Sequence, residues 1–141
     1  MTSATTIVLR NHVAELERVG QLVAAFGTEH QLPSQIVFDL TLALDEILTN
    51  IISYAYADQG NHEIVVRLSQ QAGTLVAEVE DDGRPFNPLD VPPPDLDAAI
   101  ENRPIGGLGL HIVRRVTNGL DYERAAGKNR LVLRKTLPTV D

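Results

Sequence analysis

The sequence predicts an α+β fold, a two-layer sandwich in which a mostly antiparallel sheet is covered on one face by three helices. Stretches with the 3.6-residue period of amphipathic helices are followed by stretches that alternate apolar and polar residues, the period of half-buried strands. The strand-like stretches come in neighbouring pairs with a short glycine-containing turn between them, which is typical of antiparallel hairpins. A chain of 141 residues suffices for one domain with a real core, so we expect a single domain over residues 1–141.

The first part of the chain is expected to contribute one strand and one helix before its longest helix. Thr5–Arg10 has the composition of a short strand. Asn11 is a plausible N-cap for a helix that Gly27 would end. The residues of this helix expected to face inward are Val13, Leu16, Val19, Val23 and Phe26.

The stretch from Ser34 to Tyr56 is expected to form one long helix, with Ser34 as its N-cap and no Gly or Pro inside it. Its apolar arc consists of Ile36, Leu40, Ala43, Leu44, Ile47, Leu48, Ile51 and Ala55. Glu46 and Asn50 lie one turn apart beside this arc, so their side chains share a face about 6 Å from each other. Such a pair could serve a metal ion and a reacting hydroxyl, but taken alone it more often marks a solvated face.

The second part of the chain is expected to supply two hairpins separated by a loop and a third helix. The first hairpin joins strands Glu63–Ser69 and Thr74–Asp81. The helix follows a glycine-rich turn and ends at Gly119, and the second hairpin joins Leu120–Arg124 to Arg130–Leu137. The resulting order is strand, helix, helix, strand, strand, loop, helix, strand, strand.

Asp81 is in phase with the apolar residues of its strand, namely Leu75, Ala77 and Val79. If that face packs on the helices, a carboxylate points into the interior at the end of the strand. Such a position is costly for an acid unless a hydrogen-bond donor pairs with it. The stretch Asp81–Gly83 could also be no more than a turn that ends the strand.

Residues 84–105 contain six of the eight prolines and keep neither period, so we expect a long loop, which in a compact domain is usually a functional lid or disordered. The motif GGLG, which consists of Gly106, Gly107, Leu108 and Gly109, then runs directly into the third helix, which is expected to start at Leu110. A glycine turn at a helix start presents free N–H groups and the positive end of the helix dipole, which suits phosphate. The motif has no P-loop lysine, and alone it could be a tight turn.

Composition excludes several classes of protein. The net charge of −7 and the lack of a basic patch argue against direct binding of nucleic acid. No apolar run approaches 18 residues and no signal-peptide pattern begins the chain, so we expect a cytoplasmic protein with no membrane association. The absence of cysteine excludes disulfides, and the four histidines show no zinc-ligand spacing.

Three motifs taken together resemble a known family. DEILTNIISYAY, EDDGRPFNP and GGLGLHIV are similar to the N, G1 and G2 boxes of the Bergerat-fold (GHKL) ATPases. More narrowly, the chain resembles the stand-alone anti-sigma-factor serine/threonine kinases of bacterial partner-switching systems, over nearly its whole length. The sequence departs from that family in its proline-rich lid and in Tyr54, where relatives often carry His.

The resemblance implies an ATP site between the long helix, the lid and the third helix. It implies that Asn50 coordinates Mg²⁺ and that Glu46 is the general base toward a serine hydroxyl. Asp81 would accept a hydrogen bond from the adenine amino group, and Gly83 would let the backbone approach the base. The glycines of the G2 box, with Leu108 and Leu110 between and after them, would bring backbone amides to the phosphates.

Two classes of function follow from the resemblance. One is an ATP-dependent kinase that phosphorylates an anti-sigma-factor antagonist and sequesters a sigma factor or another regulator. The other is a binding module that uses ATP only to set its conformation. Glu46 favours the kinase, because a pure nucleotide switch needs no base. A sensor histidine kinase is disfavoured, because no helix with a phosphoacceptor histidine precedes the long helix. The sequence leaves the oligomeric state open, a homodimer included.

Overall fold

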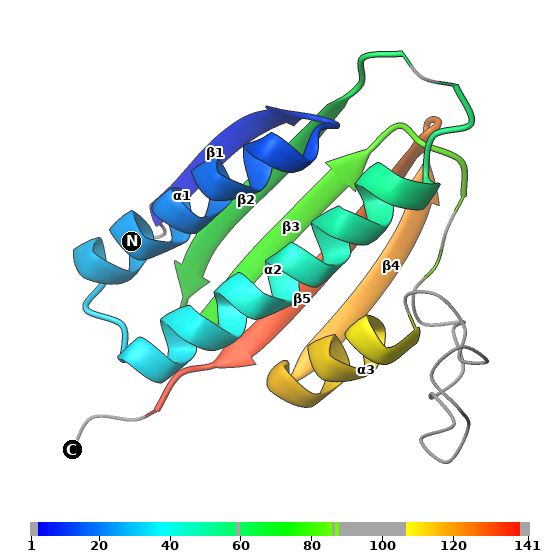
Figure 1. Ribbon diagram of the computed structural model, residues 1–141. Coiled ribbons are helices and arrows are strands. Elements are labelled where there is room, and N and C mark those ends of the chain that lie inside the picture. The colour runs from blue at the N-terminus through cyan, green and yellow to red at the C-terminus, as the bar shows by residue number, and fades with distance from the viewer. Residues whose placement is uncertain (1–2, 59, 86, 88–106, 139–141) are drawn as a thin grey trace.

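The computed structural model describes residues 3–58, 60–85, 87 and 107–138. In these residues three helices cover one face of a five-stranded antiparallel sheet, as predicted (Figure 1). The strands lie in the order β1-β2-β3-β5-β4. The elements are β1 Ser3–Arg10, the 3₁₀ turn η1 Val13–Glu15, α1 Leu16–Glu29, α2 Ser34–Tyr54, β2 Glu63–Gln71, β3 Thr74–Asp81, α3 Gly107–Val116, β4 Gly119–Ala125 and β5 Lys128–Thr136.

Both predicted hairpins are present, and each closes through a two-residue loop. Ala72 and Gly73 join β2 to β3 with φ of 47° and 80°, and Ala126 and Gly127 join β4 to β5 with φ of 53° and 77°. Two consecutive left-handed residues give a turn whose twist matches that of the strands. Glycine takes the second position because a side chain is strained there.

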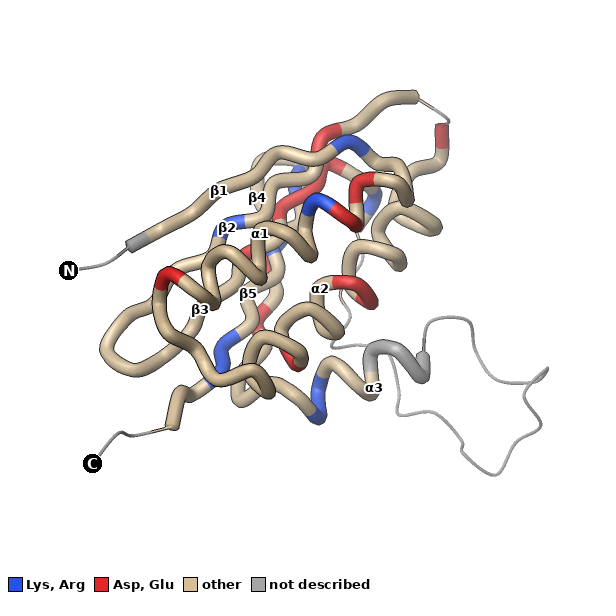
Figure 2. Tube along the Cα trace, turned by 60° about the vertical axis from the view of Figure 1, so that its left-hand side comes forward, with Lys and Arg blue, Asp and Glu red and all other residues tan. Residues whose placement is uncertain are grey.

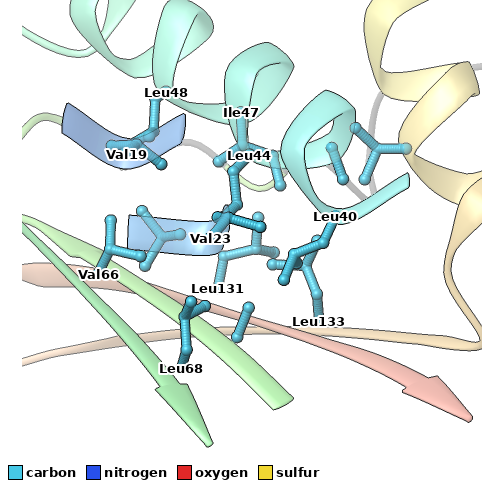
Figure 3. Close-up of a cluster of buried hydrophobic side chains, with 14 of the residues drawn as sticks. Val19, Val23, Leu40, Leu44, Ile47, Leu48, Val66, Leu68, Leu131 and Leu133 are labelled. Carbon is cyan, nitrogen blue, oxygen red and sulfur yellow. The ribbon is translucent and has the colours of Figure 1, made fainter. Parts of the chain in front are cut away.

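The core lies between the sheet and the helices, and Figure 3 shows its centre. The whole predicted apolar arc of α2 is buried against inward side chains of β2, β3 and β5. The fully buried members include Ala43, Leu44, Leu48, Ile64, Val66, Leu68 and Val23. The 3.6-residue period of α2 and the two-residue period of the strands therefore meet in one apolar layer.

The prediction that Gly27 ends the first helix is wrong. The helix α1 continues to Glu29, and the left-handed residue that follows it is Gln31, with φ of 56°. A Cβ on Gly27 would lie 2.5 Å from Cγ2 of Val37, so this glycine permits the close approach of α1 to α2. Val13 was expected inside but is 64% exposed, because residues 13–15 form the 3₁₀ turn before the helical period begins.

Other boundaries differ by a few residues. Pro33 rather than Ser34 occupies the N-cap position of α2, and α2 ends at Tyr54. The helix α3 already begins at Gly107 and stops at Val116, before Gly119. The predicted lid, residues 84–105, lies outside the described residues except for positions 84, 85 and 87.

The face of the sheet opposite the helices carries pairs of opposite charge. Glu78 of β3 accepts from Arg67 of β2 at 3.0 Å and from Arg130 of β5 at 2.6 Å. Lys and Arg occur together with Asp and Glu on the strands (Figure 2), and pairs of this kind suit a solvated sheet surface. None of the helices in the described part of the chain combines the length and the hydropathy of a membrane-spanning segment.

Candidate functional site

The C-terminal half of α2 carries the two predicted residues of the N box. Asn50 is buried, with 7% of its surface exposed, and Glu46 one turn earlier is half-buried. They share a stripe of the helix with Asp39, which lines a small void together with Val116 of α3. The stripe that contains Glu46 and Asn50 therefore runs along the side of α2 that faces α3.

The start of α3 lies level with this half of α2. The two helices pack side by side and run in opposite directions (Figure 1). The last residue of α3, Val116, is near Leu40. Ten residues of helix span about 15 Å on either element, so Gly107 comes roughly level with Asn50. The first N–H groups of α3, those of residues 107–110, have no partner within the helix and can bind an anion.

Asp81 ends β3 on the inner face of the sheet and is 5% exposed. Its Oδ1 accepts hydrogen bonds from the backbone N–H of Gly83 at 2.8 Å and from Nδ2 of Asn129 at 3.0 Å. Burial raises the pKa of this carboxyl above its ordinary value, and the two donors lower it again in part. Both described hydrogen bonds end on Oδ1, so Oδ2 is the oxygen that can accept from a ligand.

Gly83 lies against the end of α2 rather than in an open turn. A Cβ at this position would be 2.6 Å from both the Cβ and the carbonyl oxygen of Ala55. The next residue, Arg84, donates its backbone N–H to the carbonyl of Ala55 at 2.8 Å and its Nε to the carbonyl of Tyr54 at 2.8 Å. A glycine is thus required here so that the turn after β3 can pack against the C-terminus of α2. The predicted approach of its backbone to a nucleotide base stays a prediction.

Sequence reasoning missed three side chains around Asp81. Asn129 is the donor that a buried acid requires, and Tyr122 hydrogen-bonds Asn129. The ring of Tyr56 stacks on His62 with 4.3 Å between centroids. Burial raises the pKa of the tyrosine hydroxyl, and so do the charges of Asp81 and Asp82 in the acidic turn, residues 81–83. A signal for Asn129 was present, because it is in phase with the apolar Leu131 and Leu133.

The residues at this place suit a nucleotide. Nδ2 of Asn50 and the hydroxyl of Tyr56 are buried and have no hydrogen-bond partner among the described residues, an arrangement that costs stability unless a ligand supplies partners. No group of three or more Asp, Glu, His or Cys residues gathers as a metal site in the described residues. A Mg²⁺ here would need phosphate and water oxygens beside Asn50, which is the usual manner of this ion.

Comparison with known proteins gives the family. Residues 9–135 match the family model of the histidine kinase-like ATPase domain. The chain is 31% identical over 100 residues to the serine/threonine-protein kinase BtrW of Bordetella bronchiseptica, covering 71% of this chain and 70% of that one. It is 33% identical over 93 residues to the blue-light-activated histidine kinase 2 of Erythrobacter litoralis, covering 65% of this chain but 24% of that one.

A solved structure has the same fold. The crystal structure of the RsbU and RsbW domains of Rv1364c from Mycobacterium tuberculosis matches with a TM-score of 0.68 at 18% identity, over 96% of this chain. The chain spans 32% of the length of that protein. The chain therefore belongs to the histidine kinase-like ATPase domain family, and this membership implies that it binds ATP.

Proposed function

We propose that this protein is a serine/threonine kinase that transfers the γ-phosphoryl group of Mg-ATP to an anti-sigma-factor antagonist in the cytoplasm. When the antagonist is phosphorylated, the kinase sequesters a sigma factor or another regulator. The observation that carries the proposal is the buried Asp81 at the end of β3, with Oδ2 left for a ligand beside the end of α2. The similarity to BtrW, a serine/threonine-protein kinase, supports serine or threonine as the acceptor.

Asp81 is assigned to the adenine base. Its Oδ2 would accept a hydrogen bond from the exocyclic amino group of adenine. Guanine has a carbonyl oxygen at the same ring position, so the carboxylate would face an acceptor and repel it. The site should therefore bind ATP in preference to GTP.

Asn50 and the start of α3 are assigned to the metal and the phosphates. The amide oxygen of Asn50 would be a ligand of Mg²⁺, an ion that screens phosphate charge and orients the transferred group. The N–H groups of residues 107–110 would donate to phosphate oxygens. Backbone donors and one metal ion can therefore hold an anion even though the chain carries a net charge of −7.

Glu46 is assigned to the acceptor hydroxyl. It lies one turn from Asn50 and is half-buried on the side of α2 that faces α3. During transfer the serine oxygen forms a bond to the γ-phosphorus, the bond from that phosphorus to the leaving ADP oxygen breaks, and the carboxylate of Glu46 accepts the hydroxyl proton.

Two measurements test the proposal. Calorimetric titration should show Mg-ATP binding more tightly than Mg-GTP, and incubation with γ-labelled ATP should label a small antagonist protein at serine or threonine. Equal affinity for the two nucleotides would overturn the assignment of Asp81. Selective ATP binding without any transfer would instead favour the second class of function, a module that binds a regulator according to its nucleotide state.

A further inference from the structure

Asn129 is a buried amide at the centre of a hydrogen-bond cluster. It begins the inner face of β5, is 4% exposed, and lies directly opposite Asp81 in the register of β3 and β5. Its Nδ2 donates to Oδ1 of Asp81 at 3.0 Å and to the carbonyl oxygen of Arg84 at 2.9 Å. One amide nitrogen thereby holds both the carboxylate and the chain that leaves the acidic turn.

Tyr122 of β4 holds this amide in one orientation. Its hydroxyl donates to Oδ1 of Asn129 at 2.5 Å, and the tyrosine is itself half-buried. An amide has two N–H donors and one carbonyl acceptor. If it were flipped, the amide oxygen of Asn129 would face the carboxylate of Asp81 and the carbonyl of Arg84, which are both acceptors. The tyrosine hydroxyl therefore favours the orientation in which both N–H groups point at the acidic turn.

The cluster decides which oxygen of Asp81 a ligand meets. Gly83 and Asn129 both donate to Oδ1. A carboxylate fixed by two N–H groups on one oxygen has a defined plane and presents its other oxygen in a defined direction. Burial favours the neutral acid, whereas these two donors favour the ionised form, which is the stronger acceptor.

We propose that Asn129 and Tyr122 are positioning residues for purine specificity: they hold Asp81 so that its Oδ2 recognises the 6-amino group of the base. This inference rests on the proposed function, because it presumes that the base lies against Asp81. It adds residues from two further strands, β4 and β5, to the recognition of the base. It also assigns Tyr122 a role although its hydroxyl contacts Asn129 rather than the carboxylate itself.

The test compares ATP with purine riboside triphosphate, which has hydrogen in place of the 6-amino group. Wild-type protein should bind ATP more tightly by roughly 10- to 100-fold, the value of one charge-assisted hydrogen bond. Asn129→Ala should lose most of this preference by weakening ATP, while its affinity for the analogue changes by less than about 3-fold. Tyr122→Phe should lose part of the preference in the same way.

Asn118 provides a matched control. It is an exposed asparagine just before β4 whose Oδ1 accepts from the backbone N–H of Thr136, at the end of β5 remote from Asn129. Asn118→Ala should keep the wild-type preference for ATP. Because that variant also removes an asparagine hydrogen bond to β5, it separates local damage to the sheet from an effect on the base.

The outcomes separate the two proposals. If wild-type protein does not distinguish ATP from the analogue, the assignment of Asp81 to the base fails and this inference fails with it. If wild-type protein distinguishes them and Asn129→Ala weakens both ligands equally, or neither, the positioning role alone is overturned. Should Asn129→Ala not fold, as circular dichroism would show, Tyr122→Phe decides, and a full wild-type preference in that variant overturns the role.

Discussion

The polar groups near the two ends of α2 differ in how completely they are paired. At the N-terminal end, Asp39 pairs with Lys135 at 3.1 Å, and the same ammonium group donates to the carbonyl of Val116, the last residue of α3, at 2.5 Å. The void left there between α2, α3 and the sheet is about 10 Å³. That volume holds one water molecule at most. The polar groups at this end are therefore paired with other groups of the protein rather than with a ligand.

At the C-terminal end, polar groups are buried without full satisfaction. Nδ2 of Asn50 and the hydroxyl of Tyr56 have no partner among the described residues, and the carboxylate of Asp81 is held in a site that favours its neutral form. Each unsatisfied group of this kind costs about 1–3 kcal/mol. The unliganded fold is therefore less stable than an apolar version of this end would be.

The contrast shows how one helix can serve both stability and binding. Unsatisfied buried atoms also occur at His30 and Gln70, so such an atom alone does not identify a ligand site. At the end of α2 it coincides with a buried acid, the close approach of Gly83 to Ala55, and the start of α3. The free energy of ligand binding can offset the cost there, whereas the N-terminal end of α2 has no such cost to offset.

The largest effect is expected from Glu46→Gln. The amide cannot accept the hydroxyl proton, so phosphoryl transfer to the antagonist should fall by about 100- to 10,000-fold, while the affinity for Mg-ATP stays close to that of the wild type. Rates with labelled ATP and calorimetric titration measure the two quantities. The adjacent exposed Asp45→Asn is the control and should retain transfer. Full transfer by Glu46→Gln would remove the base from the mechanism.

At the opposite end, Leu40→Ala should lower stability rather than specificity. Leu40 is 4% exposed and lies where α2 packs on β3, β5 and α3. Removing its side chain from a closely packed place should cost about 2–5 kcal/mol in the free energy of unfolding, as measured with urea. The folded variant should still prefer ATP to its analogue without the amino group. Loss of that preference would mean that packing at the N-terminal end of α2 also controls binding at its C-terminal end.

Asp81→Asn should lower the affinity for ATP without lowering the stability of the fold. ATP affinity should fall more than tenfold, because a charge-assisted hydrogen bond of roughly 1.5–3 kcal/mol is lost. Stability at neutral pH should not fall and should rise slightly, since the variant no longer buries an ionised carboxylate. Titration and urea unfolding measure both quantities. A large loss of stability would show that the fold needs this charge.

The pH dependence of unfolding tests whether the ionised carboxylate of Asp81 lowers the free energy of unfolding. The pKa of Asp81 is raised in the folded protein, so the folded state binds the proton more tightly than the unfolded chain does. The stability that Asp81 contributes is then present below its ordinary pKa of 3.8 and lost as pH rises through the raised value. The difference in stability between wild type and Asp81→Asn should therefore shrink as the solution is acidified.

The smallest effect is expected at His62. Hydrogen bonds to Asp58 at 2.6 Å, and then to Asp82, raise the pKa of this imidazole above 6.5. Its contribution to stability is present below that ordinary value and lost as pH rises through the raised one. His62→Gln should remove this change in melting temperature across neutral pH. An unchanged profile would mean that the exposed ion pairs contribute nothing measurable, as many such pairs do.

Local patterns were sufficient for most of the elements. The period of α2 predicted every apolar residue of its buried arc, and alternation along β3 predicted that Asp81 shares a face with Leu75, Ala77 and Val79. These predictions succeed because a side chain's direction in a helix or strand depends on its own position in the backbone repeat. The helix limits at Gly27 and Gly119 were wrong because glycine also serves close packing and strand starts, which no local pattern distinguishes from a cap.

The partners of Asp81 were decided by the tertiary structure. The strand order places β5 beside β3, and the register then puts Asn129 opposite Asp81, 48 residues away in the chain. Tyr122 reaches the same amide only because β4 pairs with β5. The sequence by itself determined that Asp81 shares the face of the apolar residues of β3, and the structure showed that this face is the buried one. Pairing between distant strands determined which donors surround it, because such contacts depend on the whole sheet and not on the residues near either partner.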